Sequence, residues 1–137
     1  MRLTFSKQGD YAVRAMLALA GAEPGTWLSV TRISAAMAIP ERVLPRVMRD
    51  LDGAGLVEAR TGRTGGYRLA RPAGSITLLD VIAAADPEDE AHRCVLRGIA
   101  CDLDGRCAVH DVFAEARAGL SDRLNRTTLE DLVLVER

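Results

Sequence analysis

Two helical segments separated by only three residues constrain the fold of this chain more than any other feature. The first covers residues 30–37 and follows a serine that can cap a helix; the second covers residues 41–54 and stops at Gly55. Because Pro40 suits the start of a helix better than its middle, the residues between the segments form a tight turn. This spacing predicts a helix-turn-helix unit, and a longer helix is predicted before it, over residues 7–21.

The second helix sorts apolar and basic side chains onto different faces. Residues at the spacing i, i+3, i+4 and i+7 form an apolar stripe, which comprises Leu44, Val47, Met48 and Leu51. Arg42, Arg46 and Arg49 form another stripe that can lie in a DNA major groove, although a solvated basic face is the alternative for a lone helix. Pro45 lacks a backbone donor, so we expect residues 40–44 to form a lead-in turn and the regular helix to begin near Leu44.

A basic hairpin follows the second helix directly. Residues 56–60 and 67–71 have strand patterns, and the glycine-rich residues 61–66 form the turn between them. Glycines allow positive φ and let the backbone approach a partner closely, so this turn suits a minor groove or a phosphate track. The ordered set predicts a winged helix, in which the DNA-contacting residues are Arg42, Arg46, Arg49, Arg60, Arg63, Thr64 and Gly65.

The charges of the chain are divided between its two halves. Residues 1–75 hold 11 Lys or Arg and 6 Asp or Glu, whereas residues 76–137 hold 7 and 13. A sequence pI of about 6.1 argues against indiscriminate binding of nucleic acids, and the division favours one surface for phosphate and another for a different partner. We therefore expect a winged-helix DNA-binding region at 1–75 and a second region at 76–137, within one compact chain.

The second region contains a long amphipathic helix from about Cys107 to Asn125. A short helix capped by Thr77 precedes it, and a last short helix opens at Thr128. The apolar stripe of the long helix comprises Val109, Val112, Phe113, Ala116, Leu120 and Leu124. We expect this stripe to pack against a second copy of the chain, and the alternative is that it packs wholly on its own domain. The predicted fold class is mainly α, with a small β-hairpin wing and a long C-terminal dimerisation helix.

All three cysteines lie in one polar, arginine-containing loop. Six residues separate Cys94 from Cys101, five separate Cys101 from Cys107, and two separate Cys107 from His110, which shares a helix face with Cys107. Inert burial fits such a loop poorly, whereas nearby arginines favour thiolates, the metal-binding form. The wide gaps favour an iron–sulfur cluster, while a Cys3His zinc site is chemically permissible and a cysteine nucleophile lacks an oxyanion-hole pattern.

Ordered motifs extend over nearly the whole chain. They are MRLT at 1–4, GDYAVRAM at 9–16, GRTGGYRLARP at 62–72, SITLLDVIAAAD at 75–86 and TTLEDL at 127–132. With the helix-turn-helix and the three spaced cysteines, they resemble the IscR/NsrR (Rrf-two) family of bacterial winged-helix transcription regulators. The resemblance implies a homodimer linked by the long helix, and promoter binding controlled by an iron–sulfur cluster of the 2Fe-2S or 4Fe-4S type.

The same resemblance implies a set of cluster ligands. The three ligand cysteines match Cys94, Cys101 and Cys107. Similarity to the IscR-like branch gives His110 as the fourth ligand, and similarity to the nitric-oxide-sensing branch gives the partner subunit's Asp10. The chain departs from the IscR-like pattern in its first cysteine gap, which is one residue longer, and at Pro45, where that branch has a glutamate that influences site choice.

The sequence predicts a cytoplasmic protein. Residues 1–20 lack a secretory signal, and no apolar run approaches the ~18 residues of a membrane span. We therefore expect a dimeric iron–sulfur regulator that is not an enzyme, has no membrane partner, and represses transcription from palindromic operators in double-stranded DNA. The alternative is a zinc-stapled winged-helix adaptor protein, which would be colourless when purified.

Overall fold

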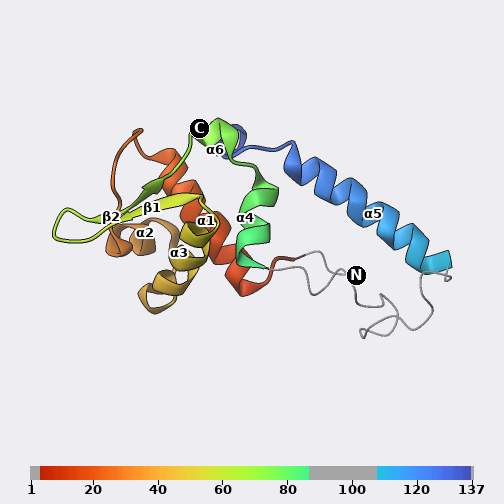
Figure 1. Ribbon diagram of the computed structural model, residues 1–137, viewed down its shortest axis with the longest axis horizontal. Coiled ribbons are helices and arrows are strands. Elements are labelled where there is room, and N and C mark those ends of the chain that lie inside the picture. The colour runs from red at the N-terminus through yellow and green to blue at the C-terminus, as the bar shows by residue number, and fades with distance from the viewer. Residues whose placement is uncertain (1–3, 87–107, 137) are drawn as a thin grey trace.

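The structure, a computed structural model, describes residues 4–86 and 108–136 (Figure 1). In chain order these residues form α1 (Lys7–Gly21), α2 (Val30–Met37), η1 (Glu41–Val43), α3 (Leu44–Gly53), β1 (Val57–Arg60), β2 (Gly66–Leu69), η2 (Ala73–Ser75), α4 (Leu78–Ala85), α5 (Ala108–Asn125) and α6 (Leu129–Glu136). The predicted fold class, mainly α with a small hairpin, is confirmed. Cys94, Cys101 and Cys107 lie outside the described residues.

The predicted bounds of α1 and α2 are confirmed, and each helix starts at a serine cap. The hydroxyl oxygens of Ser6 and Ser29 accept hydrogen bonds from backbone N–H groups one turn later, at 3.1 and 3.2 Å. The segment predicted over 41–54 divides into η1 and α3, because Pro45 stands in the first turn of α3 and cannot donate a helical hydrogen bond. The lead-in turn expected from Pro45 is therefore present.

Reciprocal capping boxes start α4 and α6. At α4, Thr77 Oγ1 accepts from the Asp80 backbone at 3.1 Å, and Asp80 Oδ2 accepts from the Thr77 backbone at 2.9 Å. Thr128 and Asp131 exchange the same two bonds at α6, at 3.0 and 3.1 Å. The backbone N–H of Thr128, together with its hydroxyl, lowers the pKa of Asp131. Both short helices thus begin where the sequence predicts them.

One hydrophobic core joins the two halves of the chain, and α1 lies at its centre. α1 packs against α2, α3, α4, α6 and β2. The apolar stripe predicted on the second helix is confirmed, because all four of its residues are buried. Ile76, Val81 and Leu129, from the second half of the chain, are fully buried in the same core. Burial of a side chain of this size stabilises the fold by about 1.5–3 kcal/mol.

A single residue before α2 ties the hairpin to the helices. β1 and β2 pair antiparallel, in a register that runs from Val57 opposite Leu69 to Arg60 opposite Gly66. Leu28 adds a bridge to β2: its N–H donates to Tyr67 O at 2.9 Å, and Tyr67 N–H donates to Leu28 O at 2.8 Å. The wing is therefore hydrogen-bonded to the chain that enters the helix-turn-helix.

α5 extends away from the rest of the molecule (Figure 1). It packs mainly against α4, and none of its residues is buried. Val109, Val112 and Leu120 of the predicted stripe are 36%, 64% and 46% exposed. Across the two described ranges, no helix is both long enough and apolar enough to span a membrane.

We expect Gly66→Ala to destabilise the protein by roughly 2 kcal/mol or more. Gly66 has φ +144°, and a Cβ there would overlap the backbone of Leu28, which the bridge to Tyr67 holds in place. Gly21→Ala is the matched control, because a Cβ at this helix end meets nothing within 4 Å. Urea unfolding of both variants measures the difference, and equal stabilities would show that the close contact between Leu28 and Gly66 is not maintained in solution.

Candidate nucleic-acid interface

Three arginines are exposed on α3 and its lead-in turn. Arg42 lies in η1, and Arg46 and Arg49 lie in α3, away from the buried stripe. Among the described residues, none of the three has a hydrogen bond or ion pair within the protein. Figure 1 shows α2, α3 and the hairpin at one end of the molecule, with α5 extending at the other. The predicted arginine stripe therefore exists as an accessible surface of η1 and α3.

The turn between α2 and α3 is held by its own hydrogen bonds. Ala38 has φ 53°, the left-handed conformation that ends α2. Ser34 Oγ donates to Ile39 O at 2.5 Å, and Ile39 N–H donates to Ser34 O at 3.2 Å. Thr31 Oγ1 donates to Glu41 Oε1 at 2.7 Å, which links the two helices across the turn. These bonds fix the angle at which α3 meets a partner.

Asp10, one of the two expected fourth ligands, participates in the same arrangement. Arg14 donates to both of its carboxylate oxygens, through Nε at 3.0 Å and Nη2 at 2.9 Å. Arg14 Nη1 also donates to Met37 O at 2.7 Å, at the end of α2. The carboxylate therefore orients an arginine that connects α1 to the helix-turn-helix.

Two consecutive glycines shape the tip of the wing. A Cβ at Gly65 would overlap the carbonyl oxygen of Arg60, so this position requires glycine whatever it contacts. Arg63 and Thr64 are exposed at the tip. Arg60, also exposed, donates from Nη2 to Thr64 O across the turn. The four wing residues predicted to contact DNA thus lie together, and Arg60 closes the loop that presents the other three.

Trp27 lies in the connection between α1 and α2, and its stacking against the wing was not predicted from the sequence. Its ring centroid lies 4.4 Å from the guanidinium carbon of Arg60 and 4.3 Å from that of Arg68. Arg68 in turn donates from Nε to Glu58 Oε2 at 2.8 Å. The hairpin register could have paired Glu58 with Arg68, but nothing in the sequence places Trp27 beside this face of the wing.

His110, the other expected fourth ligand, lies in the first turn of α5 and is partly exposed. It follows Cys107 by three residues in the sequence. Within residues 4–86 and 108–136, no three His, Cys, Asp or Glu side chains are grouped to hold a metal ion. The chemistry of the donor set, three thiols and an accessible imidazole, nevertheless fits an iron–sulfur cluster or zinc.

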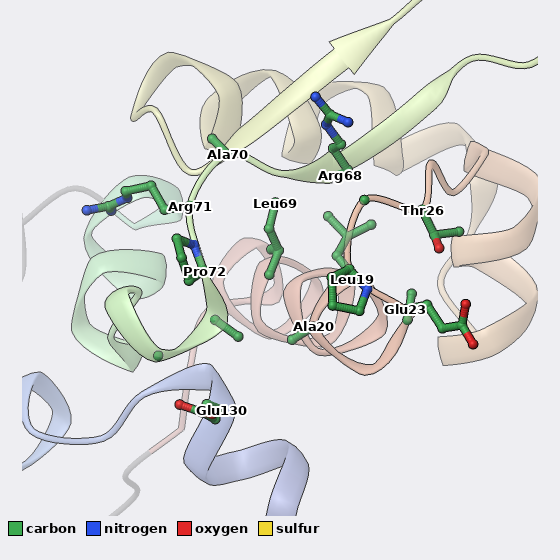
Figure 2. A pocket seen from close by; sticks show the side chains of 15 residues that line it. Leu19, Ala20, Glu23, Thr26, Arg68, Leu69, Ala70, Arg71, Pro72 and Glu130 are labelled. Carbon is green, nitrogen blue, oxygen red and sulfur yellow. The ribbon is translucent and has the colours of Figure 1, made fainter.

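A cavity of about 540 Å³ lies at the base of the wing (Figure 2). Leu19 and Leu69 line it, and the carboxylate of Glu130 in α6 borders it beside Gly74. Of its two arginines, Arg68 pairs with Glu58, and Arg71 lies 3.9 Å from Asp80.

Comparisons with known proteins agree with this geometry. The family model described as "Rrf2: Iron-dependent Transcriptional regulator" matches residues 5–134. The HTH-type transcriptional regulator IscR of Vibrio parahaemolyticus is 36% identical over 133 residues, which cover 97% of this chain and 77% of that protein. The structure of CymR, the global cysteine regulator of B. subtilis, has a TM-score of 0.81 with 26% identity and 98% of each chain covered.

The structure of T. potens IscR is similar to the same extent. Its TM-score is 0.80 with 25% identity, and the match covers 98% of this chain and 89% of that one. Proteins of this family bind DNA and regulate transcription, and they are not enzymes. The helix-turn-helix, the wing and the matched length therefore lead to one conclusion: the chain belongs to the Rrf2 family of winged-helix transcriptional regulators.

Proposed function

We propose that this protein is a dimeric, cytoplasmic transcriptional repressor whose binding to promoter DNA is controlled by an iron–sulfur cluster. The observation that carries the proposal is the arrangement of the chain. Exposed arginines that have no ion pair among the described residues occupy η1 and α3. A segment with three cysteines precedes α5, which extends from the other end of the molecule (Figure 1). DNA reading and sensing thus have separate places in one chain.

The DNA-reading surface consists of α3 and the wing. Arg42 and Arg46 lie nearest the start of the recognition helix, where base edges of a major groove are reached. Arg49 lies one turn further along, and Arg63 lies at the tip of the wing, where phosphates are the natural partners. In a two-fold dimer, two such surfaces meet an inverted repeat whose half-sites are about one helical turn, ~34 Å, apart.

The dimer is formed by α5. Val109, Val112 and Leu120 of its apolar stripe are exposed in a single chain, none of the stripe is buried, and α4 is the main neighbour of α5 among the described elements. A second copy of the same helix matches this stripe in length and apolarity, as a two-fold interface requires.

The cysteine segment and α5 provide the link between sensing and binding. Thiolates of Cys94, Cys101 and Cys107, with the imidazole of His110, are the proposed ligands, and Cys107 immediately precedes α5. When bound, an iron–sulfur cluster responds to iron supply, nitric oxide or oxidants. Ligation constrains residues 94–110 and therefore the start of α5, and a coupling of ~1–3 kcal/mol is enough to change promoter occupancy.

Replacing arginines on α3 tests the DNA-reading surface. Loss of the guanine-reading residue, Arg42 or Arg46, should weaken binding by ~1–3 kcal/mol and relax specificity at one base pair. Arg49→Ala should instead weaken binding to all sequences and reduce the salt dependence by about one ion per half-site. Arg126→Ala, which removes the same charge outside the winged helix, is the control. Salt titrations with operator and scrambled duplexes measure these effects, and parental binding by the variants at Arg42, Arg46 and Arg49 would exclude this surface.

A matched pair of alanine substitutions tests the dimer. Ala116 belongs to the apolar stripe of α5, and Ala118 lies about 200° around the helix from it; both are exposed in the single chain. Ala116→Asp should dissociate the dimer, because it places a charge in the apolar interface, whereas Ala118→Asp should not. Sedimentation velocity gives the oligomeric state, and equal behaviour of the two variants would contradict dimerisation through the stripe.

Ligand substitutions test the cluster. Cys94→Ala, Cys101→Ala and Cys107→Ala should each abolish stable cluster binding while the chain stays folded, because these cysteines belong to a polar, arginine-containing segment and should contribute ligation more than core packing. His110→Ala should make the cluster labile, whereas Asp10→Ala should leave it intact, because the Asp10 carboxylate is engaged by Arg14. Iron content, visible absorbance after anaerobic purification, and circular dichroism are the measurements.

Two results would change this assignment. A colourless protein that contains zinc would support the zinc-stapled adaptor in place of the iron–sulfur regulator. A labile cluster in Asp10→Ala beside an unchanged one in His110→Ala would transfer the fourth ligand to the partner subunit's Asp10.

A further inference from the structure

We propose that Trp27 is a positioning residue for DNA binding, which holds the guanidinium group of Arg60 ready for a phosphate. The inference rests on the proposed role of the wing in contacting DNA. Trp27 is the only tryptophan of the chain, and it lies in the connection between α1 and α2.

The pairing of the wing places Trp27 on its outer face. Leu28 bridges to Tyr67 and is buried, so the preceding side chain points to the opposite face, because side chains alternate along an extended chain. Glu58 and Arg60 are two residues apart on β1, and Arg68 stands opposite Glu58 in the register. Trp27, Arg60 and Arg68 therefore meet on one exposed surface.

The two arginines on this surface differ in what else they contact. Both guanidinium carbons lie well within 6 Å of the ring centroid, at 4.4 Å for Arg60 and 4.3 Å for Arg68. Glu58 compensates the charge of Arg68 through the bond at 2.8 Å. Arg60 donates to a neutral carbonyl, that of Thr64, and no carboxylate pairs with it in the described part of the chain. Its positive charge is held in place but not neutralised.

A cation held in this way is suited to a phosphate. An exposed arginine samples many rotamers, and immobilising it on binding opposes association. Stacking on Trp27 and the bond to Thr64 restrict Arg60 before DNA arrives, while its remaining N–H groups stay available. Phosphate contacts do not depend on base sequence, so the gain in affinity from positioning Arg60 should apply to any duplex.

A double-mutant cycle between Trp27 and Arg60 tests the proposal. Trp27→Leu should weaken binding to a mixed-sequence duplex of about three helical turns by roughly three- to tenfold, and Trp27→Phe, which keeps an aromatic face, should recover part of the loss. In the Arg60→Ala background, Trp27→Leu should have no further effect, because its role is exercised through that arginine. Fluorescence anisotropy at several salt concentrations gives the dissociation constants.

Arg63→Ala is the matched background. Arg63 belongs to the same wing and is exposed at its tip, and within the described residues it makes no hydrogen bond, ion pair or ring contact with Trp27. The full effect of Trp27→Leu should therefore persist there. Equal losses in the Arg60→Ala and Arg63→Ala backgrounds would mean that Trp27 only stabilises the wing, and would overturn the inference.

The remaining outcomes separate this inference from the proposed function. Unchanged binding by Trp27→Leu beside weakened binding by Arg60→Ala would exclude the positioning role of Trp27 and support the contact between the wing and DNA. Parental binding by Arg60→Ala would exclude both the positioning role of Trp27 and the DNA contact of Arg60. If Trp27→Leu lowers the melting temperature, the cycle is repeated with Trp27→Phe. The proposal then requires that the effect of Trp27→Phe disappears in the Arg60→Ala background and persists in the Arg63→Ala background.

Discussion

Burial of α1 is the constraint on which the rest of the structure depends. Ala12, Ala15 and Met16 are fully buried, and the small side chains let neighbouring helices approach the α1 backbone closely. α2, α3, α4, α6 and β2 all pack against this one helix. The recognition helix, the wing and the helices of the second half therefore share a single support, and none of them can shift without disturbing the contacts of the others.

Polar links of low individual strength set the geometry of the DNA-facing end. The bond from Arg14 to Met37 joins α1 to the end of α2, and the bridge between Leu28 and Tyr67 joins the wing to the start of α2. Each is worth about 1 kcal/mol, far less than the core, yet they decide where the arginines point. Stability and recognition thus depend on different residues of the same small domain.

The contacts of α4 give the proposed regulation a physical route. α5 packs against α4, and α4 packs against both α1 and α3. The contact between α4 and α5 lies at the C-terminal end of α5, where Thr77 Oγ1 donates to Asn125 Oδ1 at 3.3 Å. A change at the start of α5, where the cysteine segment joins it, must therefore be transmitted along α5 before it reaches α4 and then α3. In a dimer the same change also alters the separation of the two recognition helices. Because the half-sites of an operator have a fixed spacing, a change in this separation changes the affinity for DNA.

The sequence by itself determined the local elements of this protein. Serine and threonine caps, Pro45 and the 3.6-residue periodicity gave the helix starts, the lead-in turn and the buried stripe of α3, because these depend on hydrogen bonds and spacing within one turn. The sequence also indicated the arginine stripe and the exposed stripe of α5, since each lies on one helix. Only the tertiary structure decided what meets across elements: that Leu28 extends the wing, that Trp27 stacks on Arg60 and Arg68, and that Asp10 is engaged by Arg14. Those contacts depend on how the elements pack around α1, and periodicity within a segment carries no information about which other segment its faces will meet.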